Sequence, residues 1–176
     1  MNTNKTLKEI LSWLKHLVFA FICALLINNY LIASAVVVSS SMENTIMTDS
    51  RVMGLRVSYL LNEPGRYDII LFNPPDDVTS IPYVKRIIGL PNETVNIIEG
   101  KVYINDSDIP LDDSFIKDTA RGNYGPFIIP DNCYFVLGDN RNGSNDSRHW
   151  SNKYVPRDNI IGRLYLELYP SPHLLD

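Results

Sequence analysis

The sequence predicts a mainly β domain preceded by one N-terminal transmembrane helix. Two features predict this fold class: an uncharged apolar stretch from Leu17 to Val38, and a following series of short apolar runs separated by turn residues. The 11 prolines count against a helical alternative for that second part. The chain has 176 residues, of which 45% are hydrophobic and 20% charged, which leaves room for one modest globular domain.

The apolar stretch 17–38 is long enough to cross about 30 Å of hydrocarbon as a helix. Residues 1–16 before it carry three lysines and a single glutamate. Because positive charges favour the cytoplasmic side of a membrane helix, we expect 1–16 in the cytoplasm and 39–176 outside it. This arrangement predicts a single-pass protein of the cell membrane, with membrane lipid around its anchor.

Two other interpretations of the stretch remain open. Leu17–Ile27 follows a basic start and precedes Ala33-Ser34-Ala35, as in a cleavable secretory signal. Cleavage after Ala35 would release the domain, whereas retention tethers it, and we expect retention. The stretch could also be a buried core helix, although it lacks the polar face that most such helices show.

The apolar runs after Val38 have the lengths and residue types of strands. Glu99-Gly100 predicts a tight hairpin between two of them, and Asn73–Asp77 and Pro170–Pro172 predict loops. The run Tyr67–Phe72 is almost continuously apolar, as in a strand covered on both faces. The predicted strands are Val52–Val57, Tyr67–Phe72, Tyr83–Leu90, Thr94–Ile98, Lys101–Asn105, Cys133–Leu137 and Ile160–Leu168.

Composition argues against several functions. The net charge is -4, and because the N-terminus is basic, the rest of the chain is more acidic still, which argues against a nucleic-acid partner. The histidines His16, His149 and His173 are far apart, so no metal site is predicted. Cys23 lies in the apolar stretch and Cys133 in a predicted strand, so an intradomain disulfide is not expected.

Two polar segments beside apolar residues are candidates for chemistry. Ser39–Thr45 directly follows the apolar stretch, and taken alone it predicts a polar linker or a helix N-cap. Within Tyr83–Pro91, alternation places Lys85 on an apolar face of a strand and Arg86 on the opposite face. A lysine in such a place usually extends its ammonium to the edge of the sheet.

The third candidate segment is the polar loop Gly138–Arg148, which contains two aspartates and two arginines. Taken alone it predicts a solvated loop with surface ion pairs, each worth ~0 to 1 kcal/mol. A long polar loop costs entropy to order, however, and is more often functional than a plain connection.

In this order, and together with Arg66–Phe72, the three segments resemble the conserved boxes of the type I signal peptidases. The resemblance extends from the apolar stretch to about Gly162. It implies a membrane-bound serine endopeptidase with a Ser/Lys dyad, a largely β catalytic domain, and no metal or organic cofactor. It also implies that the substrates are signal peptides of exported preproteins, cut after a small residue, and that the secretion translocon is a further partner.

The resemblance assigns a role to each matching residue. Ser41, directly before a methionine, matches the nucleophile, and Lys85, directly before an arginine, matches the general base. Ser39 matches a serine whose hydroxyl helps to form the oxyanion hole with the Ser41 amide. The loop residues match a serine that hydrogen-bonds the lysine amine and an ion pair that holds the loop: Ser144, Asp146 and Arg148.

The chain departs from the family pattern at four positions. Val38 and Asn44 stand where the family usually has proline, Ser40 stands for a glycine, and Tyr67 stands for a common glycine before the lysine strand. Ser40 is the least expected, because a serine is less permissive in φ than a glycine. None of the four carries a catalytic atom, so we expect effects on rate and substrate preference.

The proposed roles require a buried lysine. A free lysine has a pKa of about 10.4 and is protonated at neutral pH. Apolar neighbours disfavour the ammonium, and a pKa lowered to ~7 to 8 suits a general base. We expect neutral Lys85 to accept the Ser41 hydroxyl proton, so that the alkoxide attacks the scissile carbonyl.

Other functions stay open on the residues alone. Composition permits a Ser/His/Asp triad through His149. A self-cleaving transcriptional repressor has a similar dyad, but it needs a DNA-binding helix pair in place of residues 17–38. A catalytically inactive membrane-tethered adaptor and a secreted β-rich binding module are the alternatives without catalysis; intact Ser41 and Lys85 argue against the first, and membrane retention would exclude the second.

Overall fold

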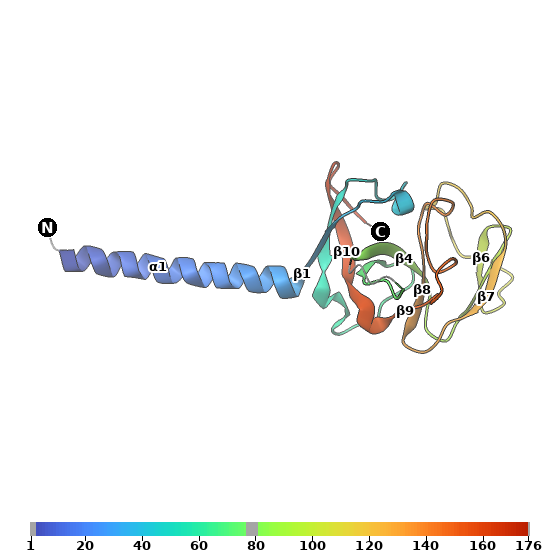
Figure 1. Ribbon diagram of the computed structural model, residues 1–176, viewed down its shortest axis with the longest axis horizontal. Coiled ribbons are helices and arrows are strands. Elements are labelled where there is room, and N and C mark those ends of the chain that lie inside the picture. The colour runs from blue at the N-terminus through green and yellow to red at the C-terminus, as the bar shows by residue number, and fades with distance from the viewer. Residues whose placement is uncertain (1–2, 77–80, 176) are drawn as a thin grey trace. The chain divides into compact units, whose positions relative to one another are not determined.

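The computed structural model describes residues 3–76 and 81–175, with the side chains described from residue 9 onward (Figure 1). The chain divides into two compact units, Met1–Ile32 and Ala33–Asp176. The first unit is helical and the second is mainly β. The predicted fold class is therefore confirmed.

The N-terminal unit consists of α1, Thr3–Leu26, which continues into a π-helical turn, η1, Ile27–Leu31. The stretch Glu9–Leu31 is long and apolar enough to cross a membrane, with a mean hydropathy of 2.2. None of its residues is buried, so the interpretation as a buried core helix is wrong. The helix fits a membrane anchor.

The predicted span 17–38 differs from this helix at both ends. α1 begins before Leu17 because the lysines, leucines and glutamate there are good helix formers. At the other end, Ile32–Val36 forms strand β1, which pairs with β2. The β-branched residues in this part favour an extended backbone. The division of the chain into residues 1–16, 17–38 and 39–176 stays a prediction.

A large antiparallel sheet forms most of the second unit, in the strand order β1-β2-β10-β3-β4-β8-β9, with β11 paired to β10 (Figure 1). The long strand β10 pairs with both β2 and β3. A Cβ atom at Gly54 would lie 1.8 Å from the Arg163 carbonyl oxygen, so only glycine fits there. The strands are β1 Ile32–Val36, β2 Arg51–Leu55, β3 Ile69–Phe72, β4 Tyr83–Gly89, β8 Cys133–Leu137, β9 Val155–Pro156, β10 Ile160–Tyr169 and β11 His173–Leu174.

A second sheet has the order β6-β5-β7, with β5 Thr94–Ile98, β6 Lys101–Ile104 and β7 Tyr124–Ile128. The predicted hairpin at Glu99-Gly100 is confirmed, since it joins β5 to β6 and both residues have positive φ, 50° and 79°. Each predicted strand overlaps an observed one, but two predicted bounds are wrong. Val57 lies in the 3-10 helix Arg56–Tyr59 that follows β2, and β3 begins at Ile69 because Tyr67 has a positive φ of 72°. The predicted loop at residues 73–77 is confirmed for 73–76, and Asp77 lies outside the described residues.

Three short 3-10 helices complete the second unit: η2 Ser40–Met42, η3 Arg56–Tyr59 and η4 Arg157–Asn159. Three hydrophobic clusters form its core, and β4 contributes to each of them through Val84, Ile87 and Ile88. Lys85 lies in the same strand, in which every residue from Val84 to Gly89 is buried, so its backbone is held within the core.

Candidate active site

The serine-rich segment after β1 is fixed by its neighbours. Ser41 lies in η2, and the next residue, Met42, is fully buried in the core. The Asn140 amide donates to the Ser41 carbonyl oxygen at 3.1 Å, and its side-chain Nδ2 donates to the Ser40 carbonyl oxygen at 3.0 Å. The segment is thus an ordered part of the domain and not a linker.

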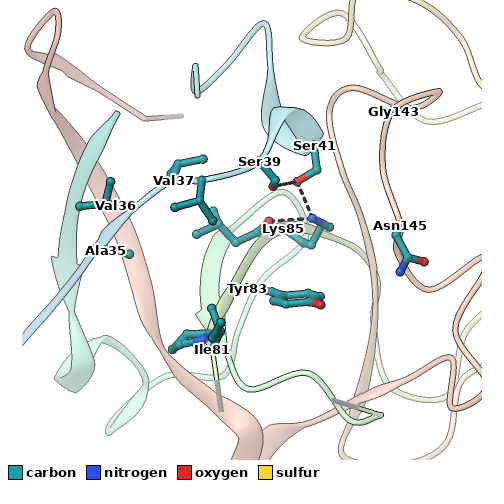
Figure 2. Close-up of a pocket in the computed structure, with 13 residues that line it drawn as sticks. Ala35, Val36, Val37, Ser39, Ser41, Ile81, Tyr83, Lys85, Gly143 and Asn145 are labelled. Atoms are coloured by element: carbon teal, nitrogen blue, oxygen red, sulfur yellow. Dashed lines mark hydrogen bonds between the residues drawn. The ribbon is translucent and has the colours of Figure 1, made fainter. Parts of the chain in front are cut away.

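Ser41 and Lys85 lie in direct contact (Figure 2). The Lys85 Nζ donates to the Ser41 Oγ at 2.6 Å and to the Val84 carbonyl oxygen at 3.2 Å. The Ser39 Oγ lies 3.1 Å from the Ser41 Oγ, and either hydroxyl can be the donor. The lysine does not extend to the sheet edge, because its side chain is 3% exposed.

Burial lowers the pKa of Lys85 to about 8, and the charges of Asp146 and Asp139 partly oppose this shift. Within residues 3–76 and 81–175, Lys85 forms no ion pair. The Tyr83 ring centroid lies 5.7 Å from its Nζ. A fraction of Lys85 is therefore neutral at physiological pH, and neutral lysine can accept a proton.

A cleft of about 430 Å³ opens at this pair (Figure 2). Two chain segments, 35–39 and 81–85, supply most of its wall, and most of their side chains are apolar. The cleft suits a peptide with small apolar side chains. The lining residues are Ala35, Val36, Val37, Val38, Ser39, Ser41, Ile81, Pro82, Tyr83, Val84, Lys85, Gly143 and Asn145.

The predicted loop-supporting pair is in contact. The Arg148 Nε and Nη2 donate to the two carboxylate oxygens of Asp146, both at 2.8 Å, and both side chains are buried. The second oxygen of Asp146 also accepts the Gly138 amide at 3.1 Å, and Arg148 donates to the Arg141 carbonyl oxygen at 2.6 Å. This pair ties the two ends of the polar loop to each other.

Ser144 differs from what the resemblance implies. Its hydroxyl is buried and has no hydrogen-bond partner in the described part of the chain, so the implied bond to Lys85 is absent. The Lys85 ammonium instead donates to Ser41 and Val84. Ser144 is nonetheless close to the site, because a Cβ atom built at Gly138 would lie 2.3 Å from both the Ser144 Oγ and the Ser41 carbonyl oxygen.

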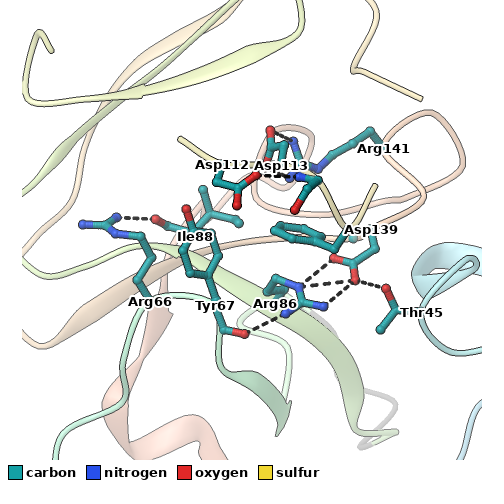
Figure 3. Close-up of polar contacts among 12 residues, drawn as sticks. Thr45, Arg66, Tyr67, Arg86, Ile88, Asp112, Asp113, Asp139 and Arg141 are labelled. Atoms are coloured by element: carbon teal, nitrogen blue, oxygen red, sulfur yellow. Dashed lines mark hydrogen bonds and ion pairs between the residues drawn. The ribbon is translucent and has the colours of Figure 1, made fainter. Parts of the chain in front are cut away.

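The expectation that the loop charges form surface ion pairs is wrong. Asp139 and Arg141 are buried, at 1% and 2% exposure. Asp139 accepts bonds from the Arg86 Nε at 3.0 Å and Nη2 at 2.9 Å, and from the Thr45 Oγ1 at 2.5 Å (Figure 3). Arg141 binds both carboxylate oxygens of Asp113 at 2.9 and 2.7 Å.

These supporting residues were missed by the sequence analysis. Asp139 joins the strand that carries Lys85 to the segment that follows Ser41, so it fixes the two halves of the site relative to each other. One signal was available: Arg86 lies on the opposite face of the same apolar strand, and a buried arginine needs a carboxylate partner.

At the positions where this chain departs from the family pattern, the unusual backbone conformations occur at Asn44 and Tyr67, and not at Ser40 as expected. Ser40 lies in η2 and does not have a positive φ, so its replacement of a glycine causes no strain there. Asn44 has φ +89°, which the proline usual at this position cannot adopt. Tyr67 has φ +72°, a left-handed conformation that favours the usual glycine.

His149 does not form a triad with Ser41. Its side chain is exposed, and its ring packs edge-on against Tyr124 at a centroid distance of 5.6 Å. The side-chain partners of the Ser41 hydroxyl are Lys85 and Ser39. Among the residues that the structure describes, no group of His, Cys, Asp and Glu is arranged to hold a metal ion.

Comparisons with known proteins identify relatives over most of the chain. The family described as signal peptidase, peptidase S26, matches residues 10–169. A probable signal peptidase I-2 from Synechocystis sp. is 38% identical over 170 residues, which cover 93% of this chain and 76% of that protein. Signal peptidase I S from Bacillus subtilis is 37% identical over 93% of this chain and 91% of that protein. The crystal structure of a signal peptidase I from Enterococcus faecalis is similar to this chain, with 29% sequence identity and a TM-score of 0.47. The alignment covers 58% of this chain and 97% of the crystallised chain.

The class of protein follows from these relatives: the chain is a peptidase, and therefore a hydrolase. More narrowly, it belongs to the signal peptidase family, peptidase S26, and the resemblance noted in the sequence is confirmed. The N-terminal apolar helix fits a membrane-anchored enzyme.

Proposed function

We propose that this chain is a serine endopeptidase that removes signal peptides from exported preproteins, with Ser41 as nucleophile and Lys85 as general base. The observation that carries the proposal is the 2.6 Å contact between the Lys85 Nζ and the Ser41 Oγ, made by a lysine whose pKa is lowered to about 8. Family membership supports the substrate class.

In the proposed mechanism, neutral Lys85 accepts the hydroxyl proton of Ser41 as the oxygen attacks the scissile carbonyl. Lys85 then gives that proton to the leaving amine, and water hydrolyses the acyl-enzyme by the same route. The lysine also donates to the Val84 carbonyl oxygen, which orients its amine toward Ser41. His149 has no role in these steps.

The oxyanion requires donors beside the nucleophile. We assign this role to the Ser39 hydroxyl, which lies 3.1 Å from the Ser41 Oγ, and to the Ser41 amide. The preference for small residues is supported by the apolar cleft, whose wall comes from residues 35–39 and 81–85.

The proposed location is the cell membrane, with residues 1–16 in the cytoplasm and the β domain outside. The basic N-terminus and the apolar stretch Glu9–Leu31 support it. Membrane lipid and the secretion translocon are the proposed partners besides the preprotein. An anchor brings enzyme and preprotein together at one surface, which raises their effective concentration. No observation favours the inactive adaptor.

The test is cleavage of a purified preprotein by the full chain in detergent. We expect cleavage after a small residue by the wild type and by the control Ser40→Ala, whose hydroxyl is exposed. Ser41→Ala and Lys85→Arg should lose at least about 10³-fold in rate, because the first removes the nucleophile and the second keeps a charge that is not shed near neutral pH. Equal cleavage by all four proteins would refute the assignment of the nucleophile, and absence of cleavage by the wild type would refute the proposed activity.

A further inference from the structure

A second cavity adjoins the active-site cleft. It has a volume of about 180 Å³ and is lined by Pro74, Asp76, Tyr83, Asn145 and Trp150. Two of these residues, Tyr83 and Asn145, also line the cleft that contains Ser41 and Lys85 (Figure 2). The Tyr83 ring centroid is 5.7 Å from the Lys85 Nζ, so this ring lies between the proposed base and the second cavity that it lines.

The aromatic wall of this cavity is firmly held. The rings of Tyr83 and Trp150 have centroids 6.3 Å apart and are inclined at 54° to each other. Both contact Phe72, at centroid distances of 6.3 and 6.1 Å, and Phe72 is fully buried. Because Phe72 also pairs with Tyr83 across the strands β3 and β4, the sheet fixes the wall before any substrate binds.

The cavity also contains a negative charge in a defined position. Asp76 is exposed, and its Oδ2 accepts the Asn152 amide at 2.8 Å, which holds the carboxylate near Trp150. Within the described ranges, no ion pair neutralises Asp76. A fixed carboxylate beside aromatic rings is complementary to a cation on an aliphatic stem.

We propose that this second cavity is a specificity subsite for a lysine or arginine side chain of the substrate, close to the scissile bond. The stem lies against Tyr83 and Trp150, and the cationic group meets the Asp76 carboxylate. The shared lining with the cleft allows one extended peptide to occupy both cavities. The inference rests on the proposed function, since it concerns the same substrate polypeptide.

The experiment uses the full chain in detergent and a set of peptides derived from one cleaved sequence. Alanine, lysine, glutamine or glutamate is placed in turn at the second position before the scissile bond and at the first three positions after it. At one of these positions, kcat/KM should be about two- to five-fold higher for lysine than for glutamine, the size expected of an exposed charge pair. Glutamate should be cleaved more slowly than glutamine, and higher salt should reduce both differences.

Two variants assign the preference to the cavity. In Asp76→Asn the ratio of lysine to glutamine should fall to about one, and in Asp76→Lys the glutamate peptide should be preferred over the lysine peptide. Asp106→Asn, a matched change of an exposed carboxylate outside both cavities, should keep the wild-type ratio.

Three outcomes would overturn the subsite. A wild type that cleaves the alanine peptide but shows no difference between lysine and glutamine at any position excludes it, while leaving the proposed function intact. A preference that persists in Asp76→Asn moves the recognition elsewhere. Failure of the wild type to cleave the alanine peptide overturns the proposed function, and the subsite with it.

Discussion

Lys85 and Arg86 are neighbours in β4 and are both buried, at 3% and 1% exposure, yet their surroundings differ. Arg86 donates to both carboxylate oxygens of Asp139 and to the Tyr67 carbonyl oxygen, and its guanidinium lies 4.1 Å from the centroid of the Phe115 ring. In the described part of the chain, Lys85 donates its hydrogen bonds to neutral acceptors, the Ser41 hydroxyl and the Val84 carbonyl oxygen.

The comparison shows how one strand supports the structure on one face and the chemistry on the other. Arg86 forms a buried ion pair with Asp139, which fixes the polar loop to the sheet. Lys85 lacks a carboxylate partner among the described residues, and burial lowers its pKa to about 8. The same burial that requires a partner for the arginine makes the lysine a base.

The largest expected change in stability comes from breaking the pair of Arg86. Asp139→Asn keeps the shape of the side chain but leaves a buried guanidinium without its counterion, so the free energy of unfolding should fall by about 3 to 5 kcal/mol. Urea or thermal unfolding of the detergent-solubilised chain measures it. Asp131→Asn, at an exposed aspartate, serves as control and should change it by less than about 0.5 kcal/mol. Equal stability of the two variants would contradict the supporting role of Asp139.

Replacing Lys85, the other buried cation of β4, should stabilise the domain, whereas breaking the pair of Arg86 destabilises it. The pKa of Lys85 is lower in the folded state, about 8, than its ordinary value of 10.5, so the unfolded state binds more protons between these pH values. The destabilisation is fully present below pH 8 and disappears as the pH rises to 10.5. Lys85→Met should therefore raise the free energy of unfolding at pH 7 by about 2 kcal/mol, after the loss of the bond to Ser41.

Unfolding measured at pH 7 and again at pH 10.5 tests this sign. The advantage of Lys85→Met should shrink over that interval. A variant that is less stable than the wild type at pH 7 would mean that Lys85 contributes to the fold as Arg86 does.

The rate should follow the titration of Lys85. Below pH 8 the neutral fraction falls about tenfold for each pH unit, so kcat/KM should rise with slope one up to about pH 8 and then level off. Because the charge of Asp139 raises the pKa of Lys85, Asp139→Asn should move the midpoint to lower pH. A profile without an ascending limb between pH 6 and 8 would exclude Lys85 as the base, since its pKa is about 8.

Strand prediction from the sequence succeeded where runs were long and rich in β-branched residues, as at Tyr83–Gly89. It missed β1, because the apolar residues after Leu31 are equally compatible with the end of a membrane helix. It also missed β7, whose Gly125-Pro126 is typical of a turn, and the two-residue strands β9 and β11.

Prediction of the active site from the sequence was limited in a similar way. Taken alone, the residues favoured a linker at Ser41 and a lysine extended to the sheet edge at Lys85, and only the family resemblance brought them together. The apolar strand around Arg86 signals that this arginine needs a carboxylate partner, but it does not identify Asp139, because the two residues are 53 positions apart and their pairing depends on how β4 and β8 align. Local pattern predicts strands, whereas contacts across the sheet require its register.

The smallest expected effect concerns Ser144, whose buried hydroxyl has no partner in the part of the chain that the structure describes. Ser144→Ala removes no hydrogen bond, so the free energy of unfolding should stay within about 0.5 kcal/mol of the wild type. The matched change Ser147→Ala removes a buried hydroxyl that accepts the Val136 amide at 3.0 Å, and should cost about 1 to 3 kcal/mol. If Ser144→Ala instead destabilises the domain as much as Ser147→Ala, its hydroxyl is bonded in solution, and Lys85 is then the partner to test by the pH dependence of kcat/KM in that variant.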